Sequence, residues 1–113
     1  MKLDVDMRKK LDEMLERAED VDLDIAYANK VLDFGDNWLE INEEEPVEGW
    51  FVSYGMADQV LGIVVYKDFV EVGIGECMRP YNQLYRGRVE DCAVDIFIGE
   101  VYKMIEYQKE WSV

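Results

Sequence analysis

The chain has 113 residues, half of them hydrophobic, and 26 acidic residues against 12 basic ones give it a formal net charge of -14. This length and apolar content suffice for one hydrophobic core, so we expect a single domain over residues 1–113. The negative charge repels phosphate groups, which argues against direct binding to nucleic acids or anionic membranes. Such a surface favours a basic protein partner, or it serves solubility alone.

Histidine is absent, and the two cysteines, Cys77 and Cys92, do not form a Cys-x-x-Cys pair. The chain therefore lacks the commonest general base and a usual zinc ligand, which disfavours an enzyme and leaves carboxylate, lysine or tyrosine chemistry open. We expect no cofactor. Both cysteines are interpreted as structural thiols, with Cys92 in the core.

The first ten residues lack the apolar stretch of a secretion signal. No apolar run approaches the roughly 18 residues that a membrane-spanning helix needs. Together with the low cysteine content, these observations predict a cytoplasmic protein.

Apolar residues recur at helical spacing between Leu3 and Ala18, which predicts an amphipathic helix over residues 3–19. A second apolar pattern follows Asp22 and ends near Gly35. We therefore expect Asp22 to cap a shorter helix over residues 22–34. The short connection predicts that the two helices form a hairpin or a sharply bent pair.

From residue 38 onward the apolar pattern has a period of two. Segments rich in aromatic and β-branched residues predict a four-stranded antiparallel meander over residues 38–42, 50–54, 59–66 and 69–74. The third segment is apolar on both faces. This pattern indicates either a central strand covered on both sides or an interface, and the second alternative raises the possibility of a homodimer.

Residues 89–109 place apolar side chains at steps of three and four, which predicts a long helix that lies across the sheet. Gly99 lies within it, where glycine costs about 1 kcal/mol relative to alanine, and suggests a close approach of another backbone. The predicted fold is therefore α+β, with two N-terminal helices, a four-stranded antiparallel sheet and a long C-terminal helix packed on it.

Acidic residues are concentrated between Glu19 and Glu48, where eleven of them accompany one basic residue, Lys30. If the second helix and the loop around Pro46 share a face, their carboxylates would fit a groove that otherwise binds phosphates. Alternatively, the charged loop protects a sheet edge and keeps a turn solvated. The predicted partner-binding residues are Asp20, Asp22, Asp24, Asp33, Asp36, Glu40, Glu43, Glu44, Glu45 and Glu48.

Asp20, Asp22 and Asp24 also have the alternate spacing of the first ligands in an EF-hand calcium loop. That loop needs glycine at its sixth position and glutamate at its twelfth. Ile25 and Val31 stand there instead. We therefore expect these aspartates to serve helix capping and the helix dipole, and we predict no metal site.

The segment from Cys77 to Arg88 has the opposite charge, because it contains three arginines and no acid. Tyrosine and arginine are enriched at interface hot spots, which makes the segment a candidate second interface. It also fits a basic patch that pairs within the chain, or a linker whose tyrosines pack on the sheet. The candidate residues are Arg79, Tyr81, Tyr85, Arg86 and Arg88.

These features lead to three functional hypotheses. The favoured one is a non-enzymatic inhibitor that occupies the basic surface of a nucleic-acid-handling protein, as phage-type DNA mimics do in anti-CRISPR or anti-restriction roles. The second is an immunity or antitoxin protein that neutralises a basic toxin nuclease, with aromatic anchors such as Trp38. The third is a small-molecule-binding domain or enzyme with a carboxylate base and a pocket lined by Trp50, Tyr54 and Tyr66.

Overall fold

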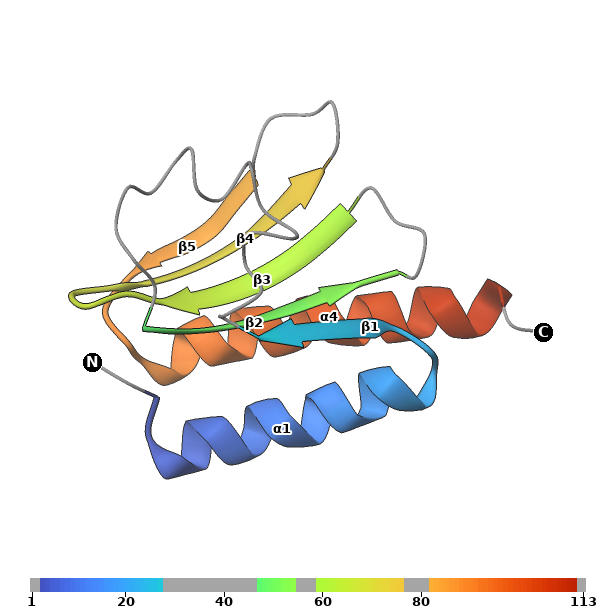
Figure 1. Cartoon of the computed structure of the whole chain (residues 1–113), viewed down its shortest axis with the longest axis horizontal. Helices are drawn as coiled ribbons and strands as arrows, with labels where there is room; N and C mark the ends of the chain where they lie inside the picture. Colours follow the sequence, from blue (N-terminus) through green and yellow to red (C-terminus); the bar gives the residue numbers. More distant parts are fainter. Residues whose placement is uncertain (1–2, 28–46, 55–58, 77–81, 112–113) are drawn as a thin grey trace.

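Two helices and five strands make up the part of the chain that the structure describes (Figure 1). The computed structural model describes residues 3–27, 47–54, 59–76 and 82–111. The predicted α+β class is confirmed. In chain order, the elements are α1 (Val5–Asp20), β1 (Asp24–Tyr27), β2 (Glu48–Ser53), β3 (Gln59–Val65), β4 (Val70–Glu76), β5 (Asn82–Gly87) and α4 (Asp91–Trp111).

The strands form one antiparallel sheet in the order β1-β2-β3-β4-β5. Each described strand pairs with the next described strand along the chain, so the sheet is an antiparallel meander. The strands predicted over residues 50–54, 59–66 and 69–74 appear as β2, β3 and β4, whereas β1 and β5 were not predicted. Strand β3 is central, and both of its faces are buried: Ile63 and Val64 point to opposite faces, and both side chains are 0% exposed. A single chain thus buries this two-faced strand, and its apolar pattern does not require a homodimer.

Helices α1 and α4 lie side by side on one face of the sheet and run in the same direction (Figure 1). Two contacts of charged side chains link the described residues of the two helices, in addition to their apolar packing. The Lys10 ammonium lies 3.7 Å from the Asp95 carboxylate, and the Arg17 guanidinium lies 5.7 Å from the centre of the Tyr102 ring. On both helices these contacts are about two turns apart, so the parallel helices stay in register over that length.

The hydrophobic core lies between the two helices and the sheet. Leu11 of α1 and Phe97 of α4 are fully buried in one cluster with Val52, Ile63 and Val72, which come from the helix-facing side of β2, β3 and β4. Fully burying a large apolar side chain contributes about 1.5–3 kcal/mol. This cluster is therefore the main contact that holds the helices on the sheet.

The prediction of a helix over residues 22–34 is wrong in the part that the structure describes. Asp22 ends α1 instead of capping a new helix, and β1 begins two residues later. The apolar residues Leu23 and Ile25 alternate with Asp22 and Asp24, which is the period of a strand. Pairing of β1 with β2 satisfies this alternation. Residues 28–34 and the strand predicted over residues 38–42 lie outside the described residues.

The segment expected as a linker contains the strand β5, which pairs with β4. Tyr85 lies opposite Val72, and Arg86 lies opposite Glu71. The register shifts between Val72 and Gly73. The pairing surface that β4 offers makes residues 82–87 a strand, which none of the alternatives for this segment included.

Two positions on α4 also differ from expectation. Cys92 is exposed in the first turn instead of buried in the core, because the buried stripe of the helix begins with Ala93. Gly99 is exposed as well, and a Cβ atom added there would meet no atom within 4 Å. Among the described residues, none makes the close approach that this glycine suggested.

We predict that Gly99→Ala raises the free energy of unfolding by about 1 kcal/mol, because alanine is the better helix former and its methyl group meets no obstacle. Urea denaturation measures the change. Gly49→Ala is the matched control: there the added methyl group would lie 3.3 Å from the Phe51 ring, so this variant gains less stability. A Gly99→Ala protein no more stable than the wild type would contradict the prediction.

Candidate functional site

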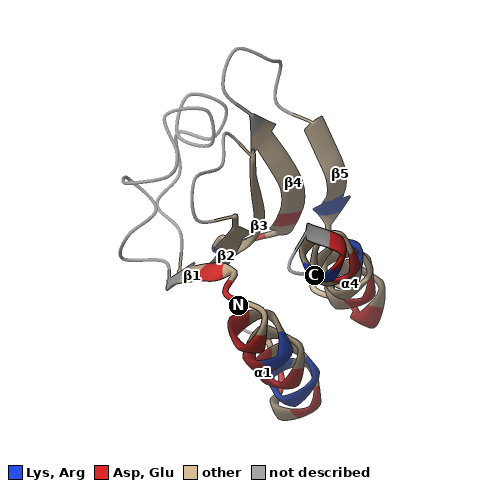
Figure 2. Cartoon of the chain, turned by 90° about the vertical axis from the view of Figure 1, so that its right-hand side faces the viewer, with Lys and Arg blue, Asp and Glu red and all other residues tan. Residues whose placement is uncertain are grey.

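Carboxylates dominate the second half of α1 and the turn into β1 (Figure 2). All seven acidic side chains in this span are exposed, and none forms an ion pair or hydrogen bond with another described residue. The single cation of the span, Arg17, lies over Tyr102. We call this group the α1 acidic surface; its members are Asp12, Glu13, Glu16, Glu19, Asp20, Asp22 and Asp24.

The position of these acids on α1 opposes helix stability. Glu19 and Asp20 lie in the last turn, where the helix dipole is negative and another negative charge costs about 0.3–1 kcal/mol. The first turn shows the favourable arrangement: the Met7 backbone N–H donates a hydrogen bond of 2.8 Å to the Asp4 carboxylate. Helix capping and the helix dipole therefore do not account for the acids at the end of α1.

Asp22 occupies a backbone position that suits glycine. Its φ angle is 63°, which is in the left-handed region. The Leu23 N–H donates to the Ala18 carbonyl at 3.1 Å and the Asp22 N–H donates to the Glu19 carbonyl at 3.0 Å, a Schellman ending for α1. Aspartate costs about 1 kcal/mol more than glycine in this conformation. The chain thus keeps a carboxylate where glycine would be more stable.

The structure brings three of the predicted partner-binding acids together and separates a fourth. Asp20, Asp22 and Asp24 lie at the turn between α1 and β1. Asp24 pairs with Ser53 at the end of β2, whereas Glu48 begins that strand, so Glu48 lies about 16 Å away along the sheet. The other predicted acids lie outside the described residues; they are Asp33, Asp36, Glu40, Glu43, Glu44 and Glu45.

Glu48 takes part in the packing of α1 on the sheet. Its side chain is 12% exposed, and one carboxylate oxygen accepts a hydrogen bond from the Arg8 guanidinium. The same guanidinium lies 5.7 Å from the centre of the Trp50 ring. The second carboxylate oxygen is buried and has no hydrogen-bond partner among the residues that the structure describes. Glu48 therefore ties α1 to β2 and offers little charge to the surface.

The candidate second interface is divided between the two faces of β5. Tyr85 packs against the core, and its hydroxyl donates a hydrogen bond of 2.8 Å to the Arg88 carbonyl. Arg86 points to the opposite face, 4.4 Å from the centre of the Phe69 ring. The described residues of this candidate interface therefore do not form one patch. Arg79 and Tyr81 lie outside the described residues.

The aromatic pocket expected for a small molecule is not formed by its predicted residues. Trp50 is buried in the core. Tyr54 follows the last residue of β2, and Tyr66 follows the last residue of β3. Because the two strands are antiparallel, these residues lie at opposite ends of the strand pair. Their side chains therefore cannot line a common cavity.

Two tyrosines have raised pKa values. Partial burial raises the pKa of Tyr54, and the neighbouring Tyr107 raises it further. Partial burial also raises the pKa of Tyr85, with contributions from Cys92 and Glu90. Both phenols therefore stay protonated near neutral pH and cannot act as general bases there. Across the described ranges, no group of three or more metal-ligating side chains is assembled.

Among the described helices, none is long and apolar enough to cross a membrane. Comparisons with family models, curated proteins and solved structures find no match to this chain. Among the described residues, the α1 acidic surface is the feature that packing explains least.

We predict that Asp22→Gly raises the free energy of unfolding by about 1 kcal/mol, because glycine adopts a positive φ angle without strain. Asp22→Ala removes the same charge and keeps the strain, so it serves as the control and does not gain this stability. Thermal or urea denaturation of both variants makes the measurement. Equal stability of the two variants would show that charge, and not the backbone, determines the effect.

A double-mutant cycle tests the structural role of Glu48. Because Arg8 pairs with a mostly buried carboxylate, Arg8→Met and Glu48→Gln should show a coupling free energy of about 1 kcal/mol in unfolding experiments. Additive effects of the two substitutions would contradict the stabilising contact between Arg8 and Glu48. Glu48 would then be a candidate for partner binding again.

Proposed function

We propose that the protein binds the basic surface of a nucleic-acid-handling protein and blocks the access of nucleic acid to it. The observation that carries this proposal is the α1 acidic surface, whose exposed carboxylates neither pair with described residues nor stabilise the helix that carries them. Local rules of stability are commonly broken at functional sites. Binding of a basic partner gives these unfavourably placed charges a role.

The geometry of α1 suits a surface that binds phosphates. Glu13, Glu16 and Asp20 recur at steps of three and four residues, so they lie along one side of the helix. With a rise of about 1.5 Å per residue, they span about 10 Å. Phosphates along one DNA strand are about 3.4 Å apart, so this row is as long as about three phosphate steps.

An immunity or antitoxin protein would use the same physical device against a toxin nuclease. The identity of the partner separates this second reading from the first. No feature of the described residues favours a small-molecule enzyme, since the predicted aromatic pocket is divided between distant positions.

Affinity capture at two salt concentrations tests the proposal. We expect a basic nuclease or nucleic-acid-binding effector to be retained at low salt, to be released at high salt, and to lose activity when the protein is added, because attraction between exposed charges is screened by salt. The captured proteins are identified by mass spectrometry and assayed for activity. Retention that does not depend on salt, or an active complex, would contradict the proposal.

Two variants with the same net charge test whether the α1 acidic surface makes the contact. The first neutralises acids of the surface: Glu16→Gln, Glu19→Gln, Asp20→Asn and Asp24→Asn. The control neutralises exposed or half-buried acids elsewhere: Asp68→Asn, Glu100→Gln, Glu106→Gln and Glu110→Gln. We expect the first variant to bind the captured effector about tenfold more weakly and the control to change affinity by less than about threefold. Equal losses would show that only total charge matters.

A further inference from the structure

We propose that Tyr102 is a positioning residue for the α1 acidic surface: its ring holds the Arg17 guanidinium against α4 and keeps this cation away from the carboxylates around it. The inference rests on the proposed function, because it concerns how the surface keeps its charge for a basic partner. It gives a role to an exposed aromatic side chain that does not belong to the hydrophobic core.

Arg17 lies between acids that commonly pair with an arginine on a helix. Glu13 precedes it by four residues and Asp20 follows it by three, so both carboxylates are its neighbours on the helix surface. A glutamate four residues before the cation is the favourable order for an ion pair. Arg17 nevertheless forms no ion pair with another residue that the structure describes. Its guanidinium lies 5.7 Å from the centre of the Tyr102 ring instead.

The Tyr102 ring competes with these carboxylates for Arg17. Tyr102 is 47% exposed although its neighbour Val101 is fully buried, so the ring lies on the flank of α4 that meets α1. At an exposed site, a cation over an aromatic ring and an ion pair between helix neighbours have similar strength. Apolar surface also favours the long stem of an arginine, and a carboxylate does not offer it. The ring therefore decides where the guanidinium lies.

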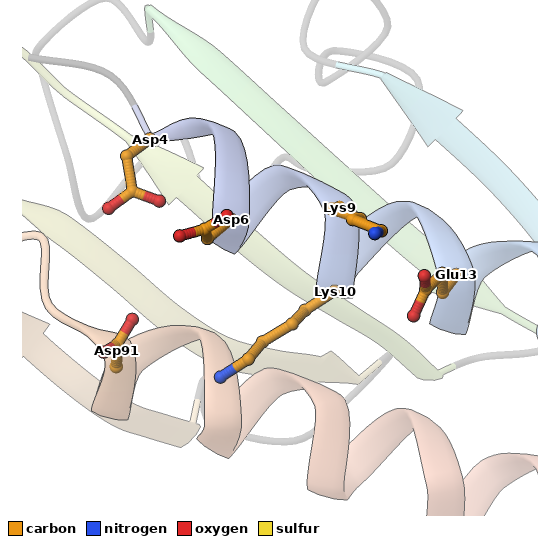
Figure 3. Close-up of a pocket in the computed structure, with 6 residues that line it drawn as sticks. All are labelled: Asp4, Asp6, Lys9, Lys10, Glu13 and Asp91. Atoms are coloured by element: carbon orange, nitrogen blue, oxygen red, sulfur yellow. The ribbon is translucent and has the colours of Figure 1, made fainter.

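Lys10 shows a different way of holding a cation of α1. Its side chain extends toward α4 and away from Glu13 (Figure 3), and the ammonium lies 3.7 Å from the Asp95 carboxylate. That contact neutralises one acid for the cation that it holds. Tyr102 is uncharged, so it holds Arg17 without neutralising an acid. The net negative charge of the α1 acidic surface is therefore larger than it would be if Arg17 paired within it.

NMR spectra of the full chain test whether the ring controls Arg17. In the wild type we expect nuclear Overhauser contacts between the Arg17 δ-protons and the Tyr102 ring. Tyr102→Leu should replace them with contacts to the side chain of Glu13 or Asp20, because these helix neighbours attract the released cation. An Arg17 side chain that contacts neither residue in this variant overturns the inference.

Binding of a labelled octalysine peptide measures the effect on charge recognition. Tyr102→Leu leaves the net charge at -14, yet it should weaken binding about threefold at low salt, because Arg17 then neutralises part of the surface. Tyr102→Phe keeps a ring and should bind the peptide as the wild type does. Fluorescence anisotropy gives both affinities. Equal losses in the leucine and phenylalanine variants overturn the inference.

Tyr107→Leu is the matched control. It is the same substitution on the same helix, at a tyrosine that is 50% exposed and whose ring contacts Tyr54. Tyr107 lies five residues after Tyr102 and thus on another side of α4. We expect this variant to change octalysine affinity by less than about 1.5-fold. A loss as large as that of Tyr102→Leu would overturn the specific role of Tyr102.

Arg17→Met separates positioning from direct contact. Without Arg17 the Tyr102 ring has no cation to hold, so adding Tyr102→Leu to this variant should change octalysine affinity by less than about 1.5-fold. A loss as large as the one in the wild-type background would mean that Tyr102 itself contacts the peptide or supports the fold. That result overturns the inference.

The inference and the proposed function fail under different outcomes. If Tyr102→Leu moves Arg17 and weakens octalysine binding while retention of the captured effector does not depend on salt, the proposed function fails and the role of Tyr102 stands. If the effector is retained only at low salt while Arg17 contacts neither Glu13 nor Asp20 in Tyr102→Leu, the inference fails and the proposed function stands.

Discussion

Leu11 of α1 and Phe97 of α4 are buried against the same face of the sheet, so the two helices are held side by side. The chain order places a five-strand meander between them, and both helices run in the same direction (Figure 1). This parallel packing brings their positive N-terminal ends together and their negative C-terminal ends together. Charged residues on the two helices therefore lie in the fields of two aligned helix dipoles.

The acidic residues at the two ends of the helix pair have opposite effects on stability. At the N-terminal end, Asp4, Asp6 and Asp91 lie where the helix dipoles favour negative charge. At the end of α1, Glu19 and Asp20 add to an unfavourable field, and the next residue but one, Asp22, keeps a strained backbone. The first set stabilises the fold, and the second is retained against stability. Recognition of a basic partner is the role that we propose for the second set.

The elements with strong periodicity were predictable from the sequence. The stripe of α1, the stripe of α4 and the alternation of β4 appear in the structure with small changes in their bounds. Residues 21–27 were not predictable by the same reading, because Leu23 and Ala26 fit a helix while Leu23 and Ile25 fit a strand. The choice depends on hydrogen bonds to β2, which lies more than twenty residues further along the chain. Local spacing contains no information on that pairing.

The same contrast between sequence and tertiary structure applies to the candidate site. Composition alone determined that the protein is strongly acidic and that it lacks histidine. Which acids face solvent was decided by tertiary structure. Glu48 follows closely on the run of acids Glu43, Glu44 and Glu45 in the sequence, yet its carboxylate accepts a hydrogen bond from Arg8. Glu13 and Glu16 on α1 belong to the exposed surface. The physical reason is that a charge acts according to its burial and its partners, and both are set by which elements pack together.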